Sequence, residues 1–231
     1  GCASVDEYLN NTILKHELTR KEKELDRINH FDTCSCQTEP VFLAYRKHEG
    51  ISAAIREWIK FHKPEYDFTT DDGVTHLLWP VTDAEVIATI RKGFEEVPTL
   101  YIADGHHRTA SSAAVSTKRR AEHPDYTGEE EFNYLMAVTF CDEDLFIMDY
   151  NRVVADLNGL TAEQFLQAIG EQFTVTPAKP GAPYAPKSKH EFGMYLNNTW
   201  YAITAKEGSF DANHPIDSLD CAILQSNLLA P

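Results

Sequence analysis

The joint at Asp104-Gly105 constrains the fold of this chain most. An apolar run, "LYIA", leads into it, and a long stretch with helical character, "RTASSAAVSTKRRAEH", follows it. An Asp-Gly dipeptide between two such patterns is typical of a turn. The sequence therefore predicts a strand that ends at this turn and a helix that starts directly after it.

The residues at this joint indicate an anion site. The first turn of a helix has unpaired N–H groups and a partial positive charge, which favour a phosphate or a carboxylate. Gly105 lets the backbone approach a ligand closely, and Arg108 can hold two phosphate oxygens. His106 and His107 can donate hydrogen bonds and can become charged beside an anion. Thr109, followed by two serines, adds hydroxyl groups to the first turn.

Asp104 has two interpretations, and the motif as a whole also has a purely structural one. The Asp104 carboxylate can cap the helix, or it can hold a Mg²⁺ ion that accompanies the phosphates. An Asp-Gly turn followed by solvated His and Arg side chains also occurs without any function. A zinc site on the adjacent His106 and His107 is disfavoured, because neighbouring helical side chains point about 100° apart.

Two further stretches contain candidate site residues. In "KHELTRKEKELDR", the spacing places His16, Arg20 and Arg27 close to one helix side, with Glu17 beside them, although a solvated, ion-paired helix face is the simpler interpretation. In "MDYNRVVADLNG", Asn151 and Arg152 follow an apolar run. Polar side chains at such a place either reach a site or pack against the C-terminal lobe that is predicted below.

The remaining patterns predict an α+β fold with two lobes. A first lobe, residues 1–156, should contain a mixed sheet with flanking helices and should carry the phosphate turn. Its expected helices cover residues 5–31, 50–62 and 83–93, and its expected strands cover 41–46, 75–81, 132–140 and 145–154, the last two forming a hairpin. A smaller helix-and-hairpin lobe, residues 157–231, should contain helices at 161–173 and 218–229 and a hairpin turning at Asn197-Asn198.

The composition of the chain indicates which classes of binding partner and which compartment to expect. The net charge of −15 disfavours nucleic acid and anionic membranes, although "TKRR" at Thr117–Arg120 is a local basic strip. No apolar run is long enough to span a bilayer. Five cysteines, an odd and sparse set, predict a reducing compartment, and we expect a cytoplasmic protein. The sequence leaves the oligomeric state open.

Taken together, the motifs are familiar. The segments "KHELTRKEKELDR", "PVFLAY", "DGVTHLLWPV", "YIADGHHRTA", "NYLMAVTF" and "IMDYNRVVADLNG" resemble, in the same order, the bacterial and archaeal family called Domain of Unknown Function 1015. Members of that family extend further at both ends, so the resemblance implies that the chain is a fragment.

The turn also resembles the phosphate-binding turn of the ParB/sulfiredoxin-like superfamily, which includes partitioning nucleotidases, sulfiredoxins and free-serine kinases. This resemblance implies that residues 104–108 line a nucleotide site, and it favours His16, Glu17 and Arg20 as additional site residues. Sulfiredoxins have a reactive cysteine where this chain has His106, so sulfinic acid reduction is not expected.

The resemblance to free-serine kinases implies a phosphotransferase that uses ATP or ADP with Mg²⁺ and a small hydroxylated metabolite, with free L-serine as the first candidate. In this hypothesis Asp104, His106, His107 and Glu17 are catalytic, and Asp104 holds the metal ion. A second set binds the nucleotide or its phosphates, and His107 belongs to both sets. The binding residues are Gly105, His107, Arg108, Thr109, His16, Arg20, Asn151 and Arg152. The alternative is a non-catalytic nucleotide-binding module.

Overall fold

The computed structural model describes residues 1–230 and confirms the α+β fold. The chain divides into two compact units, Gly1–Met148 and the residues from Asp149 onward. The boundary predicted near residue 156 falls in the stretch between Leu145 and Leu160, which contains neither helix nor strand. Each unit is described below by itself.

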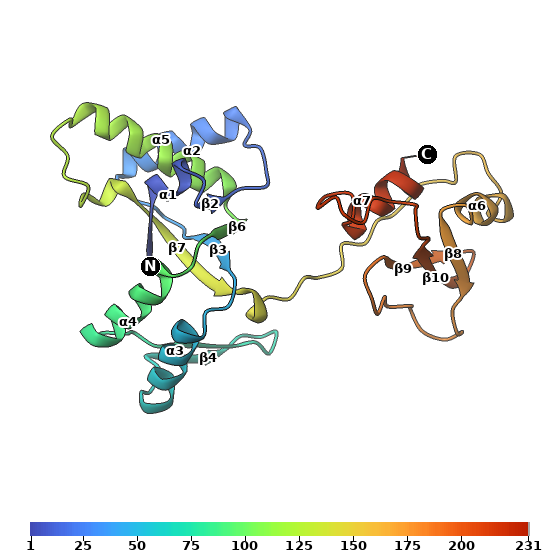
Figure 1. The fold of residues 1–231 in the computed structure, drawn as a ribbon, viewed down its shortest axis with the longest axis horizontal. Coiled ribbons are helices and arrows are strands. Elements are labelled where there is room, and N and C mark those ends of the chain that lie inside the picture. Colours follow the sequence, from blue (N-terminus) through green and yellow to red (C-terminus); the bar gives the residue numbers. More distant parts are fainter. Residues whose placement is uncertain (231) are drawn as a thin grey trace. The chain divides into compact units, whose positions relative to one another are not determined.

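A five-stranded mixed sheet forms the centre of the first unit (Figure 1). Its strands follow the order β1-β7-β3-β6-β2. The outer pairs differ in direction, since β1 runs antiparallel to β7 and β2 runs parallel to β6. The bounds are β1 Cys2–Ser4, β2 Ile13–Leu14, β3 Val41–Tyr45, β6 Leu100–Asp104 and β7 Tyr134–Cys141.

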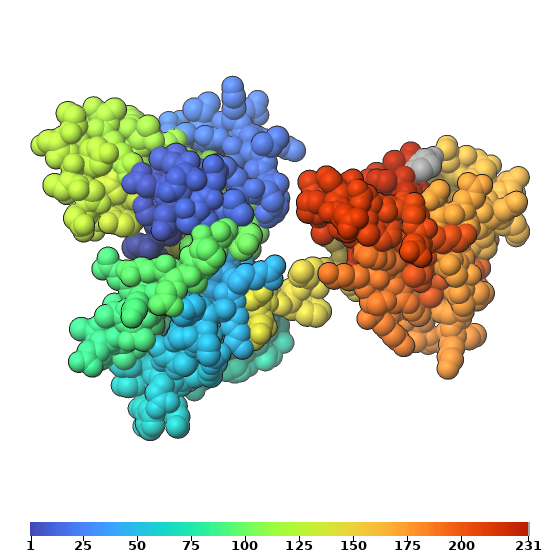
Figure 2. All heavy atoms as spheres, viewed as in Figure 1, coloured from blue at the N-terminus to red at the C-terminus, as the bar shows by residue number. Residues whose placement is uncertain are grey.

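Helices α1 (Val5–Leu9), α2 (Lys21–Cys34) and α5 (His106–Glu122) pack together beside this sheet. Figure 1 shows α2 and α5 side by side, and Figure 2 shows the dark blue N-terminal residues against α5. The shared core consists of fully buried aliphatic side chains such as Val5, Leu43, Ile102 and Leu135. This packing fixes the start of α5 at the end of β6.

A second helix pair, α3 (Glu49–Phe61) and α4 (Ala84–Glu95), packs against the ends of β3 and β7 through Tyr45, Ile51 and Cys141. The predicted cap of α4 is confirmed, because the Asp83 carboxylate accepts hydrogen bonds from the backbone N–H groups of Glu85 and Val86. The hairpin of β4 (Tyr66–Thr69) and β5 (Thr75–Leu78) lies between these helices in the sequence.

The second unit has the predicted helix-and-hairpin composition. Its antiparallel sheet has the order β8-β10-β9, with bounds Phe173–Pro177, Thr199–Ala205 and Glu191–Leu196. The turn at Asn197-Asn198 is confirmed, and both residues have the positive φ angles expected of a tight hairpin. Helices α6 (Ala162–Ile169) and α7 (Asp220–Leu224) complete the unit, which has its own core around Phe173 and Ile203.

Two predicted elements differ from the structure. The helix expected over residues 5–31 is interrupted, because α1 ends at Leu9, and β2 and a loop precede α2. The hairpin strand expected at residues 145–154 does not form. Strand β7 pairs with β3 over Ala137–Cys141 but with β1 only over Tyr134–Met136, so an occupied edge does not account for the missing strand.

Candidate functional site

The turn between β6 and α5 has the backbone conformation that its sequence predicts. Gly105 has a φ of 94°, in the left-handed region that side chains rarely allow. A Cβ atom at this position would lie 3.0 Å from Nη2 of Arg108. Glycine is therefore needed both for the turn and for the close approach of the arginine.

The start of α5 has no side-chain cap. Its N-cap residue is Gly105, and the first backbone bond of the helix runs from the N–H of Thr109 to the carbonyl of Gly105. The N–H groups of His106, His107 and Arg108 precede that bond, so they have no partner within the helix. Of the two interpretations of Asp104, the cap is wrong, because the N-cap is Gly105 and the Asp104 carboxylate pairs with Arg108.

The hydroxyl groups predicted to face a phosphate are inside the protein. Thr109 is fully buried, and its hydroxyl donates to the carbonyl of Gly105 at 3.0 Å. Ser111 is also fully buried and donates to the carbonyl of Glu24 in α2. The expectation that these hydroxyls bind phosphate is wrong, since the Thr109 hydroxyl is bonded within its own helix and that of Ser111 is bonded to α2.

Arg108 is held by two carboxylates. Its Nη2 donates to Asp104 at 2.7 Å, and its Nη1 donates to Glu39 at 3.0 Å. The arginine side chain is only 21% exposed, and its Nε has no hydrogen-bond partner among the described residues. Nδ1 of the neighbouring His107 is buried and likewise lacks a partner within residues 1–230.

The structure brings His106 together with two predicted residues from a distant part of the sequence. Nδ1 of His106 lies 3.4 Å from the Glu17 carboxylate, and the rings of His106 and His16 meet edge to face at 4.4 Å. Burial lowers the pKa of His106, His16 lowers it further, and Glu17 partly opposes both. Without a ligand, the surroundings of His106 therefore favour its neutral form, and its charging beside an anion stays a prediction.

A cavity of about 560 Å³ lies at the start of α5. It is lined by residues of the loop before α2, of α2 itself and of the turn: Glu17, Glu22, Lys23, Asp26, Arg27, Asp104, Gly105, His106, His107 and Arg108. Four of these side chains are carboxylates and three are Lys or Arg. A phosphate alone would meet mixed charge here, whereas a phosphate with a divalent cation would satisfy both signs.

Four residues around the site were not predicted from the sequence: Glu22, Lys23 and Asp26 of α2, and Glu39 before β3. The spacing of the three α2 residues on a charged helix is ordinary, and only the packing of α2 on α5 turns them toward the cavity, whereas Glu39 contacts the site through Arg108. Arg20 is exposed at the N-cap of α2 and is not among the cavity residues. The expected placement of His16, Arg20 and Arg27 on one helix side is wrong, because α2 begins only at Lys21, although Arg27 itself lines the cavity.

Asn151 and Arg152 belong to the second unit, in the stretch without helix or strand. The Arg152 guanidinium lies over the ring of Tyr150, 4.4 Å from its centroid. The strand that was expected to carry both residues is absent from this part of the described chain. Their role in nucleotide binding stays a prediction.

The basic strip on α5 serves packing within the first unit. Lys118 pairs with Asp32, and Arg119 donates to the backbone carbonyl of Asp32 and to the hydroxyl of Ser35. Arg120 pairs with the Asp6 carboxylate of α1 at 2.6 Å. These contacts tie α5 to α1 and α2, so they favour the structural interpretation of the strip over nucleic-acid binding.

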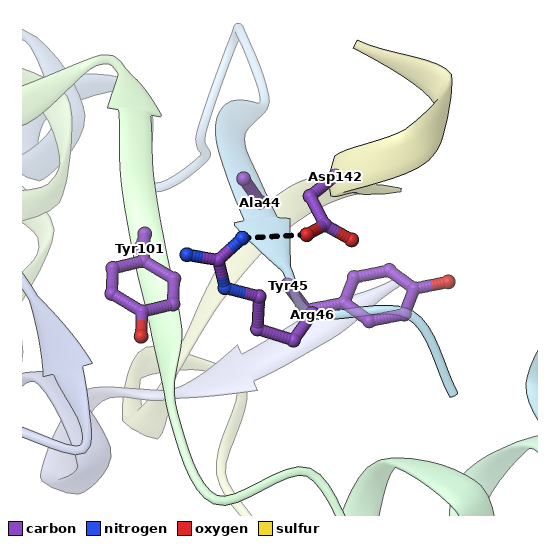
Figure 3. A pocket seen from close by; sticks show the side chains of 5 residues that line it. All are labelled: Ala44, Tyr45, Arg46, Tyr101 and Asp142. Carbon is purple, nitrogen blue, oxygen red and sulfur yellow. Dashed lines mark hydrogen bonds and ion pairs between the residues drawn. The ribbon is translucent and has the colours of Figure 1, made fainter.

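A smaller cavity, of about 190 Å³, lies at the other end of β6, where Arg46 reaches between Tyr101 and Asp142 (Figure 3). Nη1 of Arg46 donates to the Asp142 carboxylate at 2.7 Å. This hydrogen bond raises the pKa of Arg46 and lowers that of Asp142. The cavity has one arginine, already paired, and lacks the exposed helix start of the larger one.

Among the described helices, none has both the length and the apolar content that crossing a membrane requires.

Searches of the curated proteins and of the solved structures found no match to this chain. A sequence profile does match: that of the family described as "Protein of unknown function (DUF1015)", over residues 1–222 of 231. The match covers both units and every motif discussed above. The chain therefore belongs to the DUF1015 family, whose function is not known.

Proposed function

We propose that the chain binds ATP or ADP at the start of α5 and transfers its terminal phosphoryl group to a small hydroxylated metabolite. The observation that carries this proposal is the cavity of about 560 Å³ at an uncapped helix start. Backbone amides and Arg108 converge there, which is the arrangement that recognises phosphate. The likeness of the turn to ParB/sulfiredoxin-like proteins adds support, and free L-serine is the first acceptor to test.

In this proposal the amides of His106 to Arg108, with the Arg108 guanidinium, hold the phosphoryl group that moves. The hydroxyl oxygen of the acceptor attacks the terminal phosphorus, the bond from phosphorus to the nucleotide breaks, and a carboxylate takes the hydroxyl proton. Asp104 and Glu17 both line the cavity and are the candidate bases. His107 stabilises charge on the phosphoryl oxygens.

Mg²⁺ would neutralise the phosphates and would be held by Asp104, whose side chain is 72% exposed. The ion pair between Asp104 and Arg108 makes the two ligands interdependent. A metal ion on Asp104 would compete with Arg108 for the carboxylate, so the guanidinium would become free for phosphate. Metal and nucleotide should therefore bind better together than either does alone.

The first experiment is a thermal-shift titration of the full chain with ATP and ADP, each with and without Mg²⁺. Stabilisation should require the nucleotide and should be lost in Arg108→Ala. Arg46→Ala is the matched control, because Arg46 is also paired with a carboxylate but lines the smaller cavity. Absence of stabilisation in the unmodified chain, or equal effects of the two variants, would contradict the site.

The second experiment incubates the chain with Mg-ATP or Mg-ADP and a panel of hydroxylated metabolites that includes L-serine, and detects phosphorylated products by mass spectrometry. A phosphorylated product that Arg108→Ala does not form supports the transferase. Tight nucleotide binding without any product would instead support the alternative, a non-catalytic nucleotide-binding module.

A further inference from the structure

Three side chains with metal-binding atoms meet beside the larger cavity. The ligand atoms of His16, Glu17 and His106 all lie within 4.8 Å of one another. His16 and Glu17 are neighbours in the loop between β2 and α2, whereas His106 opens α5, ninety residues further along the chain. The packing of β2 beside β6 brings these segments together, because the two strands run parallel.

We propose that His16, Glu17 and His106 bind one divalent transition-metal ion of the Zn²⁺ class. The proposal concerns an ion held by protein ligands and not the Mg²⁺ that would accompany a nucleotide, and it shares only Glu17 with the candidate bases of the proposed function. Two imidazoles and one carboxylate favour zinc and neighbouring first-row ions, whereas Mg²⁺ prefers oxygen ligands.

The geometry suits an ion of this size. Two ligand atoms that share a tetrahedral zinc ion lie about 3.3 Å apart when each is about 2.0 Å from the metal. Nδ1 of His106 and the nearer Glu17 oxygen are 3.4 Å apart. The backbone N–H of His16 donates a long hydrogen bond of 3.5 Å to Nε2 of His106, which leaves Nδ1 of His106 facing Glu17. The exposed His16 side chain must move closer to complete the set, because the ligand atoms lie within 4.8 Å of one another.

His106 and the loop that carries the other two ligands are held in place before any metal binds. The His106 side chain is only 5% exposed, so its ring has little freedom. The hydroxyl of Thr19 donates to the Glu24 carboxylate at 2.8 Å, which fastens the loop to the first turn of α2. Three protein ligands leave at least one coordination position open. Because Glu17 and His106 also line the cavity, that position would be accessible to an oxygen ligand there.

The test is calorimetric titration of the tag-free full chain with Zn²⁺, without nucleotide, supported by the visible absorption spectrum with Co²⁺. We expect one ion per chain in the titration and a Co²⁺ spectrum of nitrogen and oxygen ligands. His16→Ala and Glu17→Gln should each weaken binding at least tenfold. Both residues are exposed, so these changes spare the core, whereas replacing the buried His106 could prevent folding.

Two controls separate this site from incidental binding. His214→Ala removes an exposed histidine that also contacts a carboxylate, 3.1 Å from Asp217, and it should leave the affinity unchanged. A Cys34→Ser/Cys36→Ser variant removes the exposed thiols of the Cys-x-Cys pair and should also bind normally. The proposal is overturned if the chain binds no ion, if His16→Ala and Glu17→Gln bind normally, or if the cysteine variant loses the ion.

The outcome is separable from that of the proposed function. Zinc binding without nucleotide stabilisation would sustain the metal site and remove the nucleotide site. Nucleotide stabilisation in a chain that binds no zinc would do the reverse.

Discussion

At Gly105 the backbone has a φ of 94°, and the space that a side chain would need is taken by the Arg108 guanidinium. Glycine at this position therefore both permits the positive φ angle and leaves room for the Arg108 guanidinium. Gly73, in the turn between β4 and β5, has a similar φ of 82° but open space where a Cβ would lie. Comparing the two glycines isolates the contact with Arg108 from the backbone strain.

Gly105→Ala and Gly73→Ala should each lower the free energy of unfolding by about 1–2 kcal/mol, because alanine is strained in the left-handed region. Only Gly105→Ala should also displace Arg108, since the new methyl group would lie 3.0 Å from its Nη2. Urea unfolding measures the first effect, and the NMR resonance of the Arg108 Nε–H group reports the second. An unmoved Arg108 resonance in Gly105→Ala would contradict the steric argument.

Local signals at this residue scale explain why the turn could be predicted. The Asp-Gly dipeptide, the apolar run before it and the helical stretch after it all act over a few residues, and β6 and α5 form as expected. The partner of His106 could not be predicted in this way. His16 lies ninety residues earlier, and only the pairing of β2 with β6 brings the two rings together.

Helix α5 as an element is unusual in the number of hydroxyl groups that it buries. Ser111 and Ser116 are both fully buried in this helix. Ser111 donates to the carbonyl of Glu24 at 3.2 Å, whereas the Ser116 hydroxyl has no partner among the described residues. A buried hydroxyl without a partner costs free energy, while a satisfied one contributes to stability.

Replacement of each serine by alanine should therefore affect the free energy of unfolding differently. Ser111→Ala should lower the free energy of unfolding by about 1 kcal/mol, because it removes one hydrogen bond between α2 and α5. Ser116→Ala should leave that free energy unchanged or raise it by up to about 1 kcal/mol. Urea titrations of the two variants and the unmodified chain make the comparison, and a larger loss in Ser116→Ala would refute it.

Two elements that sequence patterns predicted do not form as expected, and long-range pairing explains one of them. The apolar stripe from Val5 to Ile28 favoured one long helix, yet Asn11 adopts a φ of 65° and Ile13 pairs with Leu100 of β6. In the first lobe a long-range pairing, which periodicity does not report, therefore overrides the local preference. The apolar run at residues 145–154 favoured a strand, yet no strand forms there, and nothing in the structure explains why.

At the scale of the whole molecule, the chain consists of two compact units with separate cores. The stretch after η2 (Asp142–Asp144) belongs to neither core and has apolar side chains in contact with solvent. Phe146 is 88% exposed and Tyr150 is 79% exposed. Such a segment has neither the backbone pairing nor the burial that protects a chain from proteases.

Brief digestion with chymotrypsin should therefore cut first at Phe146 or Tyr150 and release two fragments, which mass spectrometry identifies. The hairpin aromatics Tyr66 and Phe68 are an internal control. They are 60% and 52% exposed, but their backbone is paired with β5, so they should be cut much later. Exposure alone would predict cleavage at all four residues, whereas the need for local unfolding selects the two outside any strand. First cleavage within the β4–β5 hairpin would show that backbone pairing does not control access in this molecule.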